Sequence, residues 1–346
     1  MELSIVIPVY NSSKTLQRCV DSILALDSSE YEIILVDDGS KDDSGKICDD
    51  YAAIHSFIKV IHQKNAGISA ARNAGLKIAA GKYIMHCDSD DWYNSEALSE
   101  FLSVVNDNSS LSFFGNNILI NGTEEGKYKT SAVDVPDNIA FLTTRVSHDF
   151  FGYAVWNKIY SRELLVNNRI LSIERDKVGN SDDWCEDLFL NLQYYALIKQ
   201  ANQTALPVYC LQTHNKSEEQ LNKELGTRIV HMFNDFVALR QTEVYKKISD
   251  DDFSKVFVWH IKRTFYDYLK VHSLEDARKD IINHPFGKTA LDSIKARLKD
   301  KQFFYDRYDK TTAEDYMNML RYFVSGNMTE YKLRSAVLWK IKAKGR

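Results

Sequence analysis

The sequence predicts an α/β fold with a mainly parallel central sheet, followed by a helical C-terminal region. Over roughly the first hundred residues, short β-rich apolar runs alternate with helical patterns, and a polar cluster follows each run. Beyond about Asn215, apolar residues recur at helical spacing instead. Strands that alternate with helices form βαβ units, in which consecutive strands run parallel.

The elements of the first part follow in chain order. The first strand is the apolar run Leu3–Tyr10, and Asn11-Ser12-Ser13 supplies capping oxygens for a helix whose apolar stripe starts at Leu16. The later elements are a strand at 32–36, a helix at 42–51, a strand at 57–63, a helix at about 69–79 and a strand at 83–87.

Four polar clusters lie just after the four strands. They are Pro8 to Asn11, Asp37-Asp38, Asn65 to Arg72, and Asp88 to Asp91. Because ligands of parallel sheets bind outside the carboxyl ends of the strands, we expect the four clusters to line one crevice. No G-x-G-x-x-G follows the first strand and no G-x-x-x-x-G-K-[ST] occurs, which disfavours dinucleotide oxidoreductases and P-loop enzymes.

The most acidic cluster is Asp88-Ser89-Asp90-Asp91, which directly follows the apolar run Tyr83–Cys87. Three carboxylates at the end of a buried strand repel one another unless a cation or ordered hydrogen bonds offset the charge. The cluster therefore predicts a divalent metal site. The alternative is a loop with a helix N-cap, for which Asp91 is the candidate.

Composition describes a globular protein of 346 residues with a formal net charge of −4, which gives no argument for a nucleic-acid partner. The cysteines form no C-x-x-C pair, which favours reduced, buried thiols in a cytosolic protein. No signal peptide and no membrane-spanning apolar stretch are expected. The five cysteines are Cys19, Cys48, Cys87, Cys185 and Cys210.

Together these motifs resemble the family 2 glycosyltransferases, inverting nucleotide-sugar enzymes of the Rossmann-like GT-A fold, especially bacterial enzymes of surface and capsular polysaccharide synthesis. The resemblance implies a catalytic domain over 1–215, with a nucleotide and metal half at 1–93 and an acceptor half at 94–215. The segments that carry it are Ile5–Asn11, Val36–Ser40, Asn65–Gly75, Asp88–Asp91, Trp156–Tyr160 and Glu186-Asp187.

The resemblance assigns nucleotide binding to residues of all four clusters. Asp38 would accept the imide N–H of a uracil while Tyr10 stacks on the ring, although Asp37–Ser40 could equally be a turn that caps the next helix. Arg72 would meet the diphosphate or hold the acidic cluster in place. The full set expected at the nucleotide is Pro8, Tyr10, Asp38, Asn65, Arg72 and Asp88.

For the metal, the resemblance points first to Asp90 and second to Asp88, a D-x-D pair that holds Mn²⁺ or Mg²⁺ on a diphosphate. For the general base of an inverting transfer it points to Asp187, the second acid of a Glu-Asp pair that opens a predicted helix. Members of the family often have Gly before this pair, where Cys185 stands here. The alternative is that first-turn acids complement the helix dipole.

Two weaker signals lie near the predicted base. Trp156, with Lys158 close to it, and Glu186 are expected on the acceptor side, where an indole packs against a sugar face, although a large aromatic is more often a core residue. His214 follows the apolar run Val208–Leu211 and is given no role, because a loop histidine is more often just exposed.

A helical domain is expected over 216–346, after a charged linker at 215–222. Its last segment, 332–346, is a basic amphipathic tail with Trp339, which suits an anionic membrane surface; the alternatives are packing on the preceding helices or on a second subunit. The apolar stripes that predict the helices are Leu221, Leu225, Ile229, Met232 and Phe236, then Phe253, Phe257, Ile261, Phe265 and Leu269.

The expected function is metal-dependent, inverting transfer of a hexose or N-acetylhexosamine from a UDP-sugar to a hydroxyl of a lipid-linked bacterial surface glycan. The expected location is the cytoplasm, with peripheral contact at the inner face of the plasma membrane, and a homodimer is an option. The alternatives are a non-catalytic GT-A protein that binds a glycan or nucleotide and, less favoured, a sugar nucleotidyltransferase.

Overall fold

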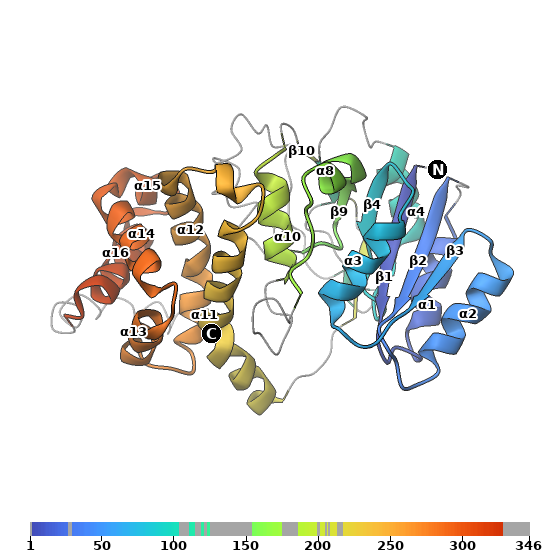
Figure 1. Cartoon of the computed structure of the whole chain (residues 1–346), viewed down its shortest axis with the longest axis horizontal. Helices are drawn as coiled ribbons and strands as arrows, with labels where there is room; N and C mark the ends of the chain where they lie inside the picture. Colours follow the sequence, from blue (N-terminus) through green and yellow to red (C-terminus); the bar gives the residue numbers. More distant parts are fainter. Residues whose placement is uncertain are drawn as a thin grey trace. The chain divides into compact units, whose positions relative to one another are not determined.

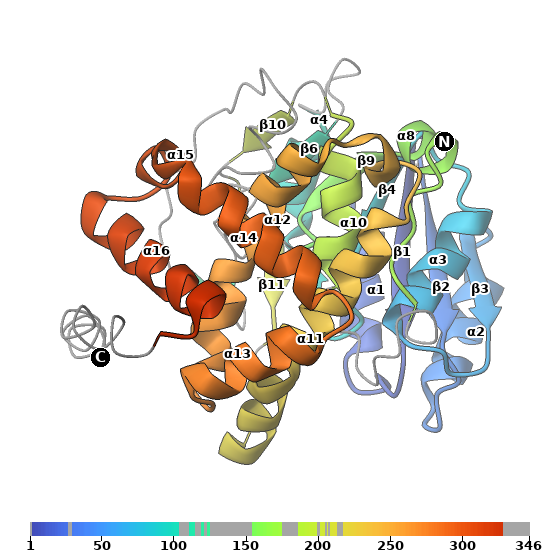
Figure 2. The same cartoon turned by 60° about the vertical axis from the view of Figure 1, so that its left-hand side comes forward.

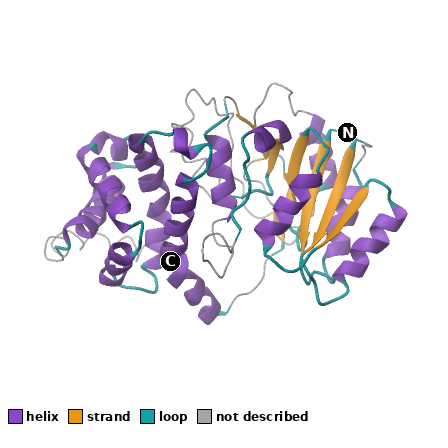
Figure 3. Cartoon of the chain, viewed as in Figure 1, coloured by secondary structure: helices purple, strands orange, loops and turns teal. Residues whose placement is uncertain are grey.

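The chain divides into two compact units, one formed by residues 1–142 and 149–215 and the other by residues 143–148 and 216–346 (Figure 1). In the described residues, strands lie in the first unit, and the second unit consists of helices (Figure 3). The computed structural model describes residues 2–26, 30–103, 111–114, 119–120, 123–124, 154–174, 186–198, 201–204, 206, 208–212 and 217–327.

The main sheet of the first unit has the strand order β10-β6-β9-β4-β1-β2-β3. Its four N-terminal strands are all parallel, while β9 runs antiparallel to both β4 and β6, and β10 is parallel to β6. The prediction of a mainly parallel sheet is therefore confirmed. The strands are β1 (Leu3–Val9), β2 (Tyr31–Asp37), β3 (Ile58–His62), β4 (Tyr83–His86), β6 (Leu111–Phe114), β9 (Lys158–Ser161) and β10 (Ala201–Thr204).

The register of the parallel strands brings the polar clusters to one edge. Val9 lies opposite Asp37, and Val6 lies opposite His86, so that β1, β2 and β4 end close together. Every residue of β1 and β2 is buried, because helices cover the sheet on both faces. The helices of this half are α1 (Leu16–Leu24), α2 (Ser44–Ile54) and α3 (Ile68–Ile78).

Gly75 lets α3 approach the sheet closely. A Cβ at this position would lie 2.4 Å from Cγ1 of Val6 on β1, a separation that real contacts do not show. The small residues around Arg72 on α3 have the same effect, so the helix brings this one long cationic side chain close to the carboxyl end of β4.

A second, smaller sheet lies beyond β4, with the strand order β5-β11-β7-β8. Two helices flank the strands of the acceptor half, and a third opens with the predicted Glu-Asp pair. These elements are β5 (Trp92–Tyr93), β7 (Leu119–Ile120), β8 (Thr123–Glu124), β11 (Tyr209–Leu211), α4 (Ser95–Ser103), α8 (Arg162–Asn167) and α10 (Glu186–Tyr195).

Figure 2 shows the helices of the second unit, which bury most of the predicted apolar stripes. On α11, Leu225, Ile229, Met232 and Phe236 are buried, as is the stripe from Phe253 to Phe265 on α12. The helices are α11 (Glu218–Arg240), η1 (Tyr245–Lys247), α12 (Asp250–Tyr268), α13 (Leu274–Asn283), α14 (Gly287–Lys299), α15 (Lys301–Tyr305) and α16 (Lys310–Ser325).

The predicted linker at 215–222 is wrong from residue 218 onward, where α11 has already begun. Ser217 and Gln220 form a capping box: the Ser217 hydroxyl accepts from the Gln220 N–H, and the Gln220 side chain accepts from the Ser217 N–H. This S-x-x-Q pattern satisfies two helix N-terminal donors, so charged residues begin the helix rather than precede it. The tail at 332–346 lies outside the described residues.

The described cysteines agree with the expectation of reduced, buried thiols. Cys19, Cys48, Cys87 and Cys210 are free and buried, and the Sγ atoms of Cys19 and Cys87 lie 3.6 Å apart. Across the described helices, none has the length and apolar character needed to cross a membrane.

Candidate active site

A cleft of about 700 Å³ opens at the carboxyl ends of β1, β2 and β4. Its walls come from the loops after these strands and from the start of α3, as the topology of a parallel sheet requires. The structure thus brings together six residues whose sequence positions suggested a shared ligand: Pro8, Tyr10, Asp38, Asn65, Asp88 and Asp90.

Asp38 organises the wall of this cleft. Its carboxylate accepts hydrogen bonds from the Gln63 side chain at 2.7 Å and from the backbone N–H groups of Ala66 at 2.9 Å and Gly67 at 2.8 Å. Asp38 therefore links the loop after β2 to the loop that enters α3. A carboxylate has about four acceptor sites, so one remains for a ligand N–H. Tyr10, opposite, is 45% exposed.

Asp37 has a structural position instead. It accepts a hydrogen bond from the Ser40 N–H at 2.9 Å and pairs with His62 Nδ1 at 2.9 Å. Although burial opposes it, hydrogen bonds from Ser40 and His62 lower the pKa of Asp37. The interpretation of this segment as a turn is therefore correct for Asp37. Neither Asp37 nor Asp38 caps α2, because the backbone N–H and the hydroxyl of Ser44, the first residue of that helix, donate to Asp42 instead.

Asp88 and Asp90 both line the cleft. Burial raises the pKa of Asp88; Arg72 opposes this shift, whereas the carboxylates of Asp187 and Asp90 add to it. The backbone of this loop is fixed, because Arg18 donates to the Asp90 carbonyl at 2.9 Å. A cation bound beside Asp88 and Asp90 would favour the charged form of both carboxylates.

Asp91 does not cap the next helix, and that interpretation is wrong. The carboxylate points back into the protein, where it accepts from the Tyr209 hydroxyl at 2.8 Å and from the Gln212 N–H at 2.7 Å. Helix α4 is capped by Asn94, whose side chain accepts from the Ala97 N–H at 3.2 Å. Burial, with Asp88 adding to it, raises the pKa of Asp91 to about 8.

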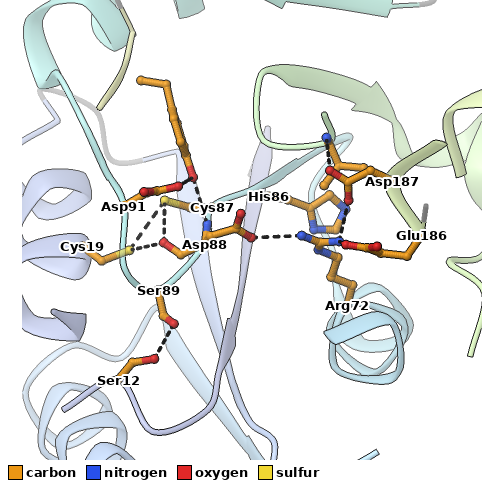
Figure 4. Close-up of polar contacts among 12 residues, drawn as sticks. Ser12, Cys19, Arg72, His86, Cys87, Asp88, Ser89, Asp91, Glu186 and Asp187 are labelled. Carbon is orange, nitrogen blue, oxygen red and sulfur yellow. Dashed lines mark hydrogen bonds and ion pairs between the residues drawn. The ribbon is translucent and has the colours of Figure 1, made fainter. Parts of the chain in front are cut away.

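Arg72 connects the cleft to the predicted base (Figure 4). Its guanidinium is 2% exposed, with Nη2 3.0 Å from Asp88 and Nη1 2.7 Å from Asp187 and 3.5 Å from Glu186. Although burial opposes the charge, these three acids raise the pKa of Arg72. These ion pairs match the expectation that Arg72 holds the acidic cluster in place, and its contact with a diphosphate stays a prediction.

Asp187 opens α10, as predicted, with Leu188, Phe189, Leu192 and Tyr195 buried beneath it. One carboxylate oxygen, Oδ1, accepts from Arg72, and the other, Oδ2, accepts from the backbone N–H of Val155 at 3.1 Å. Both oxygens are therefore anchored, on elements far apart in the sequence. Arg72 thus links the first turn of α10 to the loop of Asp88, and the role of Asp187 as the base stays a prediction.

The predicted acceptor residues are both engaged with protein neighbours. Trp156 is 4% exposed and stacks on Tyr209, with ring centroids 4.3 Å apart and planes at 13°. A sugar would reach the indole only by displacing a neighbour, so its acceptor role stays a prediction. Glu186 faces Arg72. His214 lies outside the described residues.

Sequence reasoning missed Tyr209 and noted Lys158 only as a weak signal beside Trp156. Tyr209 accepts a hydrogen bond from the Asp88 N–H at 3.1 Å while donating to Asp91, so it fixes both ends of the acidic loop. Lys158 is 1% exposed and donates to the Ala154 carbonyl and to Asn157 Oδ1. The lysine could have been found from the sequence, because a charged residue directly before the apolar pair Ile159-Tyr160 is unusual for a buried strand. A tyrosine in a short strand gives no comparable signal.

Lys158 yields a test of this burial. Burial lowers its pKa to about 7, against the opposing effect of Asp187. Between pH 7 and the unfolded pKa of about 10.4, the unfolded chain binds more protons at this site, so stability rises with pH. The unfolding free energy of the wild type relative to Lys158→Met should rise by up to about 1.4 kcal/mol per pH unit from pH 7 to 9 in urea titrations. If the unfolding free energies of wild type and Lys158→Met changed equally with pH, the Lys158 amine would not be buried in the way described here.

A mainly parallel sheet with an acidic cleft at its carboxyl edge, beside a helix that opens with a carboxylate pair, defines a domain of the GT-A class. Residues 4–167 match the family model described as Glycosyl transferase family 2. The match assigns residues 4–167, just under half of the chain, to the family 2 glycosyltransferases.

Curated relatives of this chain are also glycosyltransferases. The uncharacterized glycosyltransferase EpsJ of Bacillus subtilis is 35% identical over 174 residues, 49% of this chain and 50% of EpsJ. The poly(ribitol-phosphate) beta-glucosyltransferase of Bacillus spizizenii is 30% identical over 212 residues, 58% of this chain and 32% of that enzyme. The chain thus matches half or less of the length of these two relatives.

The fold is also found in S. aureus TarS. The crystal structure of TarS residues 1–349 in complex with UDP-GlcNAc is similar with a TM-score of 0.68, covering 98% of this chain and 92% of that chain at 20% sequence identity. A likeness at this identity shows a shared fold.

Proposed function

We propose that this protein is an inverting glycosyltransferase that moves a hexose or N-acetylhexosamine from a UDP-sugar to a hydroxyl of a bacterial surface glycan. One observation carries the proposal: Arg72 joins Asp88, which lines the cleft, to Asp187, which opens α10. A site for a nucleotide diphosphate and a candidate base therefore adjoin one another, as a single displacement at a sugar carbon requires.

The donor would occupy the cleft. Its volume of about 700 Å³ is in the range of small-molecule and cofactor sites. Tyr10 offers an exposed ring to a base, and Asp38 retains an acceptor position for an imide N–H. Support for a UDP-sugar also comes from TarS, a protein of similar fold that was crystallised with UDP-GlcNAc.

Asp90 and Asp88 would hold Mn²⁺ or Mg²⁺, since carboxylate oxygens are the ligands that these hard cations prefer. In the described part of the chain, no three His, Cys, Asp or Glu side chains form a metal-binding group, so diphosphate oxygens would complete the site. The residues fit the ion, because Asp88 and Asp90 line the same cleft and present carboxylate oxygens to it. When bound, the cation would neutralise charge that grows on the departing UDP.

Asp187 would act as the general base. As the acceptor hydroxyl attacks the sugar C1, its proton would pass to the Asp187 carboxylate, and the bond from C1 to the UDP oxygen would break on the opposite face. An α-linked donor would then give a β-linked product. The printed name of the B. spizizenii relative, a beta-glucosyltransferase, is consistent with this outcome.

A surface glycan is the proposed acceptor, lipid-linked and presented at the inner face of the plasma membrane, where the basic tail at 332–346 would bring the protein. The poly(ribitol-phosphate) acceptor in the name of that same relative is one polymer of this class. A non-catalytic binding protein would be expected to have lost an acid among Asp38, Asp90 and Asp187, yet the chain has all three.

Calorimetric titration of UDP, with Mn²⁺ and with chelator, tests the nucleotide and metal assignments before the donor sugar is known. We expect binding that Mn²⁺ strengthens, and we expect Asp90→Ala to lose at least about tenfold in affinity with Mn²⁺, or about 1.4 kcal/mol. Asp50→Ala, on the exposed face of α2, is the matched control and should bind as wild type does. No UDP binding in either condition would end the proposal; positive binding would be followed by a screen of UDP-sugars.

A further inference from the structure

One backbone peptide group, between Ala154 and Val155, is held from both sides. Its N–H donates to Oδ2 of Asp187 at 3.1 Å. Its carbonyl oxygen accepts from Nζ of Lys158 and from Nδ2 of Asn191, the latter at 3.3 Å. The peptide that contacts the candidate base is therefore itself fixed by two side-chain donors.

Both donor side chains, Lys158 and Asn191, are buried and are held by further hydrogen bonds. Lys158 is 1% exposed and Asn191 and Val155 are fully buried. Lys158 is also bound to Asn157 Oδ1 at 2.7 Å, and Asn191 Oδ1 accepts from the Tyr160 hydroxyl at 2.8 Å. Asp187 and Asn191 are four residues apart on α10, so they project from one face of the helix toward the same peptide.

We infer that Lys158 and Asn191 are positioning residues for Asp187, which act through the Ala154–Val155 peptide. This inference rests on the proposed function, in which Asp187 is the base. Hydrogen bonds to the carbonyl polarise the peptide and strengthen its N–H as a donor to the carboxylate. They also keep the peptide plane in place, so that Val155 and Arg72 together hold both oxygens of Asp187.

The amide of Val155 reports on this contact without any donor or acceptor sugar. In protein labelled with ¹⁵N-valine, we expect Lys158→Met to move the Val155 amide resonance upfield and to speed its hydrogen exchange by about tenfold, equivalent to 1.4 kcal/mol. Asn191→Leu should do the same to a smaller extent. Lys158→Arg, which keeps the charge and the donors, should largely restore the resonance, and Lys46→Met on exposed α2 should leave it unchanged.

Kinetics separate positioning from a general loss of structure. With a UDP-sugar that the wild type turns over, Lys158→Met should lower kcat by about tenfold while the affinity for UDP and the donor KM stay unchanged. An equal loss in KM would indicate damage to the cleft instead and would overturn the inference.

The outcomes distinguish this inference from the proposed function. An unchanged Val155 amide in Lys158→Met and Asn191→Leu would overturn the positioning role, whatever the activity. If both variants fail to fold, the same resonance is measured in Asp187→Asn. An unchanged Val155 amide resonance in that variant would show that the hydrogen bond from Val155 to Asp187 is absent, which would overturn the inference. A displaced amide without turnover of any UDP-sugar by the wild type would uphold the contact and reject the transferase.

Discussion

Asp187→Asn is expected to bind UDP as the wild type does and to transfer sugar about 10²- to 10⁴-fold more slowly, the range that general bases contribute. The asparagine oxygen can still accept from Arg72, so the cluster around the guanidinium persists. An amide cannot take the proton of the acceptor hydroxyl. Calorimetry would measure UDP affinity, and UDP release from the donor identified by screening would measure transfer.

Glu186→Gln is the matched control for this experiment. Glu186 precedes Asp187 in the first turn of α10 and also pairs with Arg72, at 3.5 Å rather than 2.7 Å. Its amide variant removes the same charge from the same guanidinium, and we expect it to retain activity within about tenfold of wild type. Full activity of Asp187→Asn, or an equal loss in Glu186→Gln, would refute the assignment of the base.

Arg72→Met is expected to destabilise the protein by about 3–5 kcal/mol near pH 7.5 and to abolish transfer. The variant leaves Asp88, Glu186 and Asp187 without the cation that all three face, and the Asp88 pKa is already raised by burial and by neighbouring acids. Urea unfolding with a tryptophan or circular-dichroism signal would measure the loss.

The pH dependence of this loss has a definite sign. Without Arg72, the folded protein would hold protons on these acids at a pH where the unfolded chain has released them, so the deficit should shrink as pH falls from about 7.5 toward 5. Arg72→Lys keeps the charge but not the fork that reaches Asp88 and Asp187 together, and should lose less stability than Arg72→Met. Equal stability of Arg72→Met and wild type at pH 7.5 would show that the acids are adequately solvated.

Much of the first unit could be predicted because its signals are local. The four apolar runs matched β1 to β4 with boundaries that differ by no more than one residue, and parallel pairing followed from their alternation with helices. Convergence of Pro8, Asp38, Asn65 and Asp88 on one cleft was likewise a consequence of topology.

Other expectations were wrong where a local sequence pattern is compatible with two different structures. Asp91 precedes a helix as an N-cap does, yet burial beside Tyr209 gave its carboxylate other donors, and Asn94 took the capping position. The charged stretch after residue 215 was interpreted as linker, although its S-x-x-Q pattern is a helix start. In both cases the sequence was compatible with the observed structure as well as with the predicted one, and the local pattern gave no ground to prefer either.

The sequence by itself determined the α/β class, the segments that form the strands around the cleft, and the acids that give the cleft its charge, because apolar periodicity and strand-end chemistry are properties of short segments. Only the tertiary structure decided which groups those acids face. Arg72 and Asp187 are separated by 115 residues, and Asp187 and Val155 by 32. Contacts over such separations depend on how helices pack on the sheet, and no local pattern encodes a pairing between side chains that meet only after the chain has folded.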